Sequence, residues 1–221
     1  MKQWTGGYGY IVTIVGPMFA EKSGELVKEC LNIEAYGSKK YKAFKPKKDD
    51  RFANDKIVSR LSTMSKEEDF KLSLVAENLP EIIDDKVIEH VLSYINDYDV
   101  FAFDEIQFYK GKIVDLILEL FYYEKLVIIA GLNMSYEGRA YGKIGEIMAI
   151  SNEVIMKTAY CRVCKGIATH TQRLKNGAPA PLEELDMVGD KNVAKKEINY
   201  EYEPRCGSCF VPPNKVEGIK Y

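Results

Sequence analysis

The feature that most constrains the fold is an apolar run that ends at Gly16 and is followed by Lys22 and Ser23. Residues 9–15 are mostly β-branched and uninterrupted, which indicates a buried strand of a parallel sheet. From Ser23 onward, apolar residues recur at helical spacing as far as Gly37, which predicts a helix that ends there. A strand, a glycine turn, a lysine–serine pair and a helix are together typical of a phosphate-binding loop.

The loop departs from the pattern G-x-x-x-x-G-K-[ST] at Glu21, which stands where the second glycine belongs. A carboxylate about 5 Å from a phosphate charge costs about 3 kcal/mol at an effective dielectric near 20. That cost corresponds to about a hundredfold loss of nucleotide affinity. A backbone conformation that only glycine adopts easily would add to it. The alternative interpretation is a chance Lys-Ser pair after a strand.

The rest of the N-terminal part alternates between strands and helices. Further strands are predicted at 41–45, 98–103 and 126–130, and further helices at 85–95, 111–124 and 144–156. This alternation implies right-handed crossovers and an α/β fold with a mostly parallel sheet and helices on both faces.

Two adjacent acids follow the apolar strand that ends at Phe103. Asp104 has the position of an acid that holds Mg²⁺ beside a phosphate loop. Glu105 can accept a proton from an attacking hydroxyl, although a solvated acid at a helix start is an equally good local interpretation. Together with the loop, the two acids indicate a nucleotide-binding enzyme.

Four of the five cysteines form two C-x-x-C pairs near the C-terminus: Cys161, Cys164, Cys206 and Cys209. Two such turns supply four thiolates, which complete a tetrahedral, structural Zn²⁺ site. Residues 165–205 separate the pairs by more than in the usual zinc ribbon, so a loop must extend between them. The alternatives are a redox pair or buried cysteines, and Cys30 is expected in the core.

Composition narrows the class of protein. A formal charge of −2 argues against a general nucleic-acid-binding surface. There is no apolar stretch long enough to span a membrane and no signal-peptide core, so we expect a cytoplasmic protein with reduced thiols. Residues 1–157 are predicted to form a nucleotide-binding domain, and residues 158–221 a small zinc-binding domain.

Further motifs follow one another along nearly the whole chain. They are Gly16-Pro17-Met18-Phe19-Ala20, Phe44-Lys45-Pro46 with Asp49 and Arg51, Phe103-Asp104-Glu105-x-Gln107-Phe108, Gly131-Leu132, Tyr141-Gly142 and Thr171-Gln172-Arg173-Leu174. With both cysteine pairs, they give the chain a clear similarity to the zinc-containing thymidine kinases of the cellular, bacterial and large-DNA-virus type.

The resemblance implies a P-loop (RecA-like) domain with a zinc-ribbon-like lasso domain, and phosphate transfer from ATP to the 5′-hydroxyl of thymidine. Deoxyuridine is a second candidate substrate. The resemblance assigns ATP and Mg²⁺ to Gly16, Lys22, Ser23, Asp104 and the lid residue Arg51, with Glu105 as general base. It assigns the nucleoside to Met18, Phe108, Leu132, Tyr136, Tyr141, Thr171 and Tyr202. It also implies a homotetramer and makes thymidine triphosphate, the feedback inhibitor of that family, a candidate ligand.

Several positions differ from the family pattern. Besides Glu21, with Gly24 where the family has glutamate, they are Arg60, Asn133, Glu137, Arg139 and Tyr141. The first alternative to a thymidine kinase is therefore a catalytically weakened homologue that binds nucleotides. A zinc-containing P-loop ATPase that binds nucleic acid is a remote alternative.

Overall fold

The computed structural model describes residues 4, 6–47, 55–58, 72–182 and 200–213. Two compact units divide the chain. The first comprises Met1–Val15, Glu21–Asn133 and Ala140–Lys157, and the second comprises Gly16–Ala20, Met134–Arg139 and Thr158–Tyr221. The predicted lid residue Arg51 and the divergent Arg60 lie outside the described residues.

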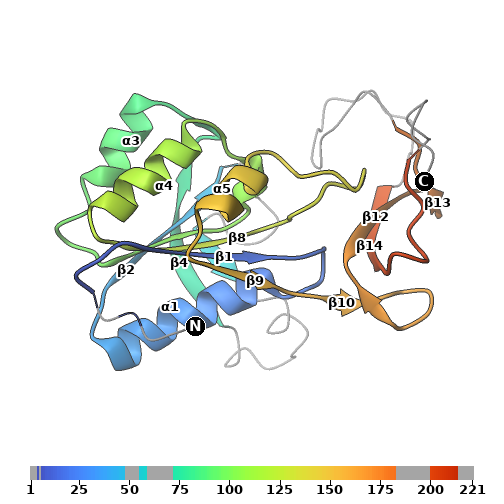
Figure 1. The fold of residues 1–221 in the computed structure, drawn as a ribbon, viewed down its shortest axis with the longest axis horizontal. Coiled ribbons are helices and arrows are strands. Elements are labelled where there is room, and N and C mark those ends of the chain that lie inside the picture. Colours follow the sequence, from blue (N-terminus) through green and yellow to red (C-terminus); the bar gives the residue numbers. More distant parts are fainter. Residues whose placement is uncertain (1–3, 5, 48–54, 59–71, 183–199, 214–221) are drawn as a thin grey trace. The chain divides into compact units, whose positions relative to one another are not determined.

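A seven-stranded sheet forms the centre of the first unit (Figure 1), in the order β3-β4-β2-β6-β8-β1-β9. Its strands are β1 (Tyr10–Val15), β2 (Tyr41–Pro46), β3 (Lys56–Val58), β4 (Ser73–Leu79), β6 (Val100–Phe103), β8 (Leu126–Gly131) and β9 (Glu153–Met156). Every pairing is parallel except that of β3 with β4. The central strands β6 and β8 are buried along their whole length, which explains their unbroken apolar sequences.

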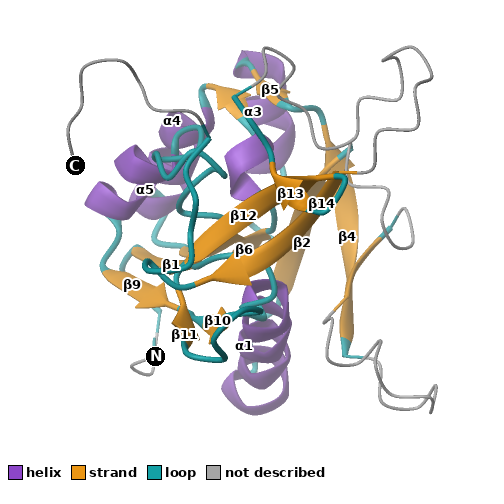
Figure 2. Ribbon diagram, turned by 90° about the vertical axis from the view of Figure 1, so that its right-hand side faces the viewer, coloured by secondary structure: helices purple, strands orange, loops and turns teal. Residues whose placement is uncertain are grey.

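Helices cover both faces of this sheet (Figures 1 and 2). On one face are α3 (Asp85–Leu92), α4 (Ile113–Tyr122) and α5 (Ile144–Ile150), and on the other is α1 (Lys22–Gly37). Two apolar cores result because alternate residues of each strand point to opposite faces, as Phe101 and Ala102 do. Cys30 lies in the α1 core, where burial raises the pKa of its thiol. The predicted α/β class, with a mostly parallel sheet and helices on both faces, is confirmed.

Short elements complete the first unit. A 3₁₀ turn, η2 (Ile106–Phe108), follows β6, and two short strands, β5 (Ile82–Ile83) and β7 (Lys110–Gly111), pair in parallel. The end of α1 differs from the expectation: the left-handed residue there is Ser38, with φ of 53°, and Gly37 is still helical.

One predicted helix was wrong in its second half. The expected helix 144–156 ends at Ile150, and residues 153–156 form β9, which pairs in parallel with β1. Polar contacts to β1 explain the change. The N–H of Ile11 donates to Oδ1 of Asn152 at 2.8 Å, and the hydroxyls of Thr13 and Ser151 are hydrogen-bonded at 2.7 Å. These contacts hold Ser151 and Asn152 beside β1, so the residues that follow them pair with β1 at the edge of the sheet.

The second unit is built from short strands. They are β10 (Ala159–Tyr160), β11 (Ile167–Ala168), β12 (His170–Lys175), β13 (Ala178–Pro179) and β14 (Tyr200–Arg205). β10 and β11 form one antiparallel pair, and β12 lies between β13 and β14 in an antiparallel sheet.

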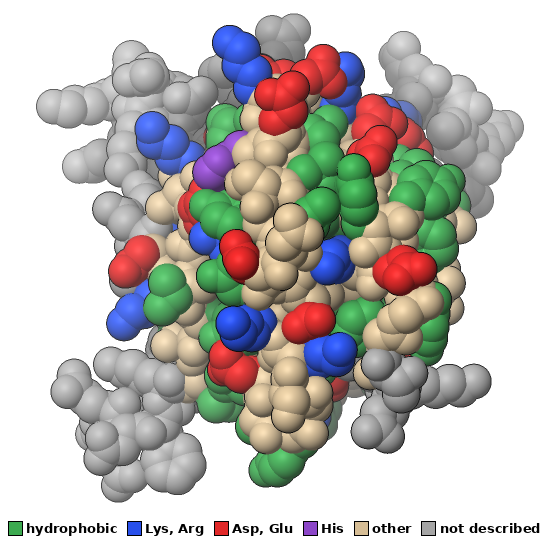
Figure 3. Space-filling view, turned by 90° about the vertical axis from the view of Figure 1, so that its left-hand side faces the viewer, with side chains coloured by type: hydrophobic (Ala, Val, Ile, Leu, Met, Phe, Trp, Pro, Cys, Tyr) green, Lys and Arg blue, Asp and Glu red, His purple; other side chains and the backbone are tan. Residues whose placement is uncertain are grey.

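Charged side chains of both signs are interspersed on the face shown in Figure 3, and no basic patch dominates its coloured residues. In the described part of the chain, no helix has both the length and the apolar character needed to cross a membrane.

Candidate active site

Two predicted Mg²⁺-binding side chains, Ser23 and Asp104, are in direct contact. Ser23 lies in the first turn of α1, and Asp104 directly follows β6. The Ser23 hydroxyl donates a 3.0 Å hydrogen bond to Oδ1 of Asp104, which is only 5% exposed. The N–H of Glu105 donates to the same oxygen at 2.9 Å. A hydroxyl and a buried carboxylate are hard oxygen donors, so the pair fits Mg²⁺.

The residue between the predicted phosphate loop and α1 has an unusual backbone conformation. Glu21 occupies the position before the helix with φ of 53° and ψ of 40°, which is left-handed. This conformation costs a residue with a Cβ about 1–2 kcal/mol, whereas glycine adopts it readily. The structure therefore places a non-glycine side chain where the backbone favours glycine. Lys22 follows as the first helical residue, at the positive end of the helix dipole.

An ion pair connects the start of α1 to the residue after β9. Nζ of Lys157 donates to Oε2 of Glu25 at 2.7 Å, and the N–H of Lys157 donates to the carbonyl of Val15 at 2.7 Å. The hydrogen bond from Lys157 holds the pKa of Glu25 below its ordinary value. The pair thus connects α1, the helix after the predicted phosphate loop, to the ends of the neighbouring strands β1 and β9.

Glu105, the predicted base, is half-buried and left-handed, with φ of 50°. Nε2 of Gln107 donates to its Oε2 at 2.5 Å. Oε1 of the same amide accepts the N–H of Leu132, the residue after β8, at 2.9 Å. A carboxylate next to a metal-binding pair can accept a proton from an attacking hydroxyl.

Two predicted nucleoside-binding aromatics contact each other in the first unit. The rings of Phe108 and Tyr141 meet edge to face, with centroids 6.0 Å apart. Both residues are half-buried, as is Leu132, the third predicted wall residue of this unit. Phe108 is therefore not fully buried in the core.

In the second unit the structure brings Met18 and Thr171 together. The N–H of Met18 donates to Oγ1 of Thr171 at 3.0 Å, and Thr171 on β12 is 3% exposed. Gly16 belongs to the same unit as Met18. A buried hydroxyl thus fixes the backbone of the loop segment Gly16–Ala20.

The other predicted residues of this unit lie around Arg173, which is 5% exposed. Its guanidinium lies 4.8 Å from the ring centre of Tyr136 and 4.2 Å from that of Tyr200. Tyr202 is opposite Arg173 in the β12–β14 register. Cation–π contacts of this kind hold the segment of Tyr136 against the sheet.

The four predicted metal ligands form a compact cluster. The sulfurs of Cys161, Cys164, Cys206 and Cys209 all lie within 4.8 Å of one another, and those of Cys164 and Cys206 are 3.6 Å apart. In a tetrahedral zinc site with Zn–S bonds near 2.3 Å, sulfurs are about 3.8 Å apart. The donor set and its spacing therefore fit a structural zinc ion.

Hydrogen bonds shift the pKa values of three thiols in the cluster. The backbone N–H of Cys164 is the main reason that the pKa of Cys161 falls to about 6. The hydrogen bond with Cys209 lowers the pKa of Cys206, and the same contact raises that of Cys209 to about 12. This division arises because the thiol of Cys209 donates to Cys206, and a cation at the centre would favour thiolates at all four positions.

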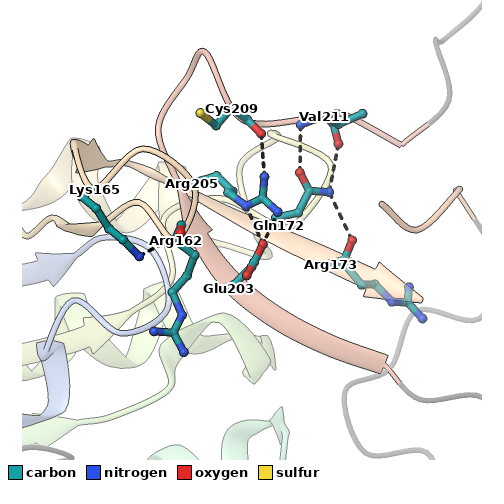
Figure 4. A network of polar contacts seen from close by, with 8 residues as sticks. All are labelled: Arg162, Lys165, Gln172, Arg173, Glu203, Arg205, Cys209 and Val211. Carbon is teal, nitrogen blue, oxygen red and sulfur yellow. Dashed lines mark hydrogen bonds and ion pairs between the residues drawn. The ribbon is translucent and has the colours of Figure 1, made fainter. Parts of the chain in front are cut away.

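Polar contacts support the second cysteine turn (Figure 4). Arg205 pairs with Glu203 and donates to the carbonyl of Cys209 at 3.2 Å. The amide of Gln172 accepts the N–H of Val211 at 2.8 Å and donates to its carbonyl at 3.0 Å. These contacts attach the segment after β14 to the sheet.

Sequence reasoning missed two well-connected residues, Gln107 and Arg173. Both belong to motifs that had been noted, but neither had been given a role. The signal for Gln107 was its place two residues after Glu105, the second of the two acids that follow the buried strand β6. Arg173 lies two residues after Thr171 on β12, which puts both side chains on one face of the strand.

Comparison with protein families gives one match. A family model described as "TK: Thymidine kinase" covers residues 9–210, and so spans both units and both cysteine pairs.

Proposed function

Because the chain belongs to the thymidine kinase family, we propose that it transfers the γ-phosphate of ATP to the 5′-hydroxyl of thymidine, with deoxyuridine as a second substrate. The observation that carries this proposal is the contact between Ser23 and Asp104 beside Glu105. It combines a metal-binding pair and a base at the end of a buried strand.

In this proposal each residue has one task. Lys22 and the backbone of the loop from Gly16 bind the ATP phosphates, and Arg51 reaches them from the polar segment. Ser23 and Asp104 would hold Mg²⁺, which neutralises charge on the phosphates. Glu105 accepts the proton of the 5′-hydroxyl as its oxygen bonds to the γ-phosphorus. The bond from that phosphorus to the bridging oxygen breaks, and ADP leaves with the electron pair.

Seven residues are proposed to contact the nucleoside, as the resemblance implies. Phe108, Leu132 and Tyr141 supply apolar walls, and the others are Met18, Tyr136, Thr171 and Tyr202. Zinc on the four cysteines has a structural role in this proposal. The homotetramer and feedback inhibition by thymidine triphosphate remain predictions from the resemblance, and the cytoplasmic location remains a prediction from composition.

A weakened, nucleotide-binding homologue is a second candidate, which Glu21 favours. Its carboxylate and left-handed backbone stand where the phosphate loop calls for glycine. One experiment separates the two: thymidine phosphorylation with ATP and Mg²⁺, measured for the wild type beside Glu21→Gly. Turnover by the wild type supports the kinase. Turnover only by the variant supports the weakened homologue. If neither protein phosphorylates thymidine and neither binds ATP in a titration, both candidates are contradicted.

A further inference from the structure

Gln107 is a buried amide with a fixed orientation. It is 3% exposed, and its Oε1 accepts the backbone N–H of Leu132 at 2.9 Å. Because a backbone N–H can only donate, the atom that faces it must be the amide oxygen. The amide NH₂ therefore faces Oε2 of Glu105, which lies 2.5 Å away.

Gly131 and Gly142 make room for Gln107 because neither has a side chain. A Cβ on Gly131 would lie 2.5 Å from Oε1 of Gln107, and a Cβ on Gly142 would lie 2.7 Å from its carbonyl oxygen. Gly142 also has a φ of +58°. Any side chain at these positions would displace the glutamine, so the chain is built to keep it in place.

This geometry fixes the carboxylate. The NH₂ of Gln107 donates to one oxygen of Glu105, which limits the rotation of the carboxylate. It also fixes the carboxylate relative to Leu132, because the same amide holds the backbone of that residue.

On the basis of the proposed kinase function, we infer that Gln107 is a positioning residue: it orients the base Glu105 and couples it to the nucleoside wall at Leu132. Gln107 acts through Glu105 and need not touch either substrate.

The informative substitution is Gln107→Glu, which keeps the size and the acceptor for Leu132 but removes the donor to Glu105. We expect kcat to fall about 10- to 100-fold, as for a displaced catalytic group. Thymidine affinity should change less than threefold, since the acceptor for Leu132 remains.

Gln172→Glu is the matched control. Gln172 is 1% exposed, and it also accepts a backbone N–H and donates to a carbonyl, both of Val211. The control should lose thermal stability while kcat stays within twofold of wild type. A Gln107→Glu enzyme with kcat within twofold of wild type, or one that loses as much thymidine affinity as kcat, would overturn the inference.

Two further variants cover the other outcomes. If Gln107→Glu does not fold, Gln107→Met, which removes both hydrogen bonds at similar length, should lower kcat and also weaken thymidine binding. An unchanged kcat in that variant contradicts the inference. Glu105→Gln separates a failure of the proposed base from a failure of the positioning role. If this variant keeps full activity, the proposed base is wrong. If it is inactive while Gln107 variants behave as wild type, only the positioning role fails.

Discussion

The hydroxyl of Ser23 donates a 3.0 Å hydrogen bond to Oδ1 of Asp104, although 81 residues separate the two in the chain. The contact forms because α1 starts beside the end of β6, with Asp104 held by its own N–H bond to the carbonyl of Phe44 at 3.0 Å. A serine and a carboxylate in contact provide the two oxygen types that hold Mg²⁺ beside a phosphate loop.

Asp104→Asn should therefore impair use of the metal more than the fold. Loss of a charged ligand or its support typically weakens metal binding by about 10- to 100-fold. We expect the Mg²⁺ concentration for half-maximal turnover to rise by this factor, with a smaller change for Ser23→Ala. Ser23→Thr keeps the hydroxyl and serves as control. An unchanged Mg²⁺ requirement in Asp104→Asn would show that another group binds the metal.

Glu105→Gln should lower kcat while thymidine affinity stays nearly unchanged. General bases contribute about 10²- to 10⁴-fold to rates, and that contribution is made in the transition state rather than in binding. Steady-state kinetics and thymidine titration by calorimetry measure the two quantities separately. A collapse of binding with normal kcat would assign Glu105 to the substrate site instead.

Glu21 has two effects that different substitutions can separate. Glu21→Gln removes the charge but keeps the left-handed strain, so it should tighten ATP by about 10- to 100-fold. Glu21→Gly removes both, and should in addition raise the free energy of unfolding by about 1 kcal/mol. ATP titration and thermal denaturation give the two values.

Two controls accompany this experiment. Ser38→Gly relieves the same kind of strain at the other end of α1, where φ is 53°. It should stabilise the chain without altering ATP affinity. Gly24→Glu alone should have little effect on ATP. If neither Glu21 variant changes ATP affinity, the side chain does not face the phosphates or the loop does not bind them.

The four clustered sulfurs predict one tightly bound zinc ion per chain. Cys164→Ser should lose the metal and destabilise the second unit, because metal binding and folding are coupled in small zinc modules. Cys30→Ala, which changes the remaining cysteine, should keep its zinc. Elemental analysis of protein purified without chelator is the measurement, and an absence of zinc there would contradict the prediction.

The Lys157–Glu25 pair predicts a pH-dependent stability. Its hydrogen bond holds the pKa of Glu25 below the ordinary 4.5. A depressed folded value stabilises the chain fully above about pH 4.5 and is lost as pH falls through that folded value. Wild type should thus have a higher Tm than Glu25→Gln at pH 7, and the gap should narrow below pH 4.5. A double-mutant cycle with Lys157→Met isolates the pair. A gap that is constant from pH 7 to 3 would assign the effect to something other than ionisation.

Local sequence predicted most of the first unit because its strands are buried on both faces and its helices have clear apolar stripes. It failed at residues 153–156, since the partner that makes them a strand, β1, lies far away in the chain. The sequence also predicted that Glu21 would occupy a backbone conformation that glycine adopts more easily, and its φ of 53° agrees.

The roles of Gln107 and Arg173 needed the structure. The contacts of Gln107 depend on the register of β6 with β8, which places Leu132 beside η2. Those of Arg173 depend on the pairing of β12 with β14 and on Tyr136, a residue from another segment. Neither register nor segment packing can be read from residue types alone.

The hydrogen bond from Met18 to Thr171 joins residues 153 positions apart. During synthesis at about 5–20 residues per second, the ribosome delivers Thr171 roughly 8–30 s after Met18. A nascent chain that has reached Lys157 already contains every strand of the seven-stranded sheet. Its loop segment Gly16–Ala20 must nevertheless wait for β12, so a segment near the start of the chain reaches its final hydrogen bonding only after Thr171 has been translated.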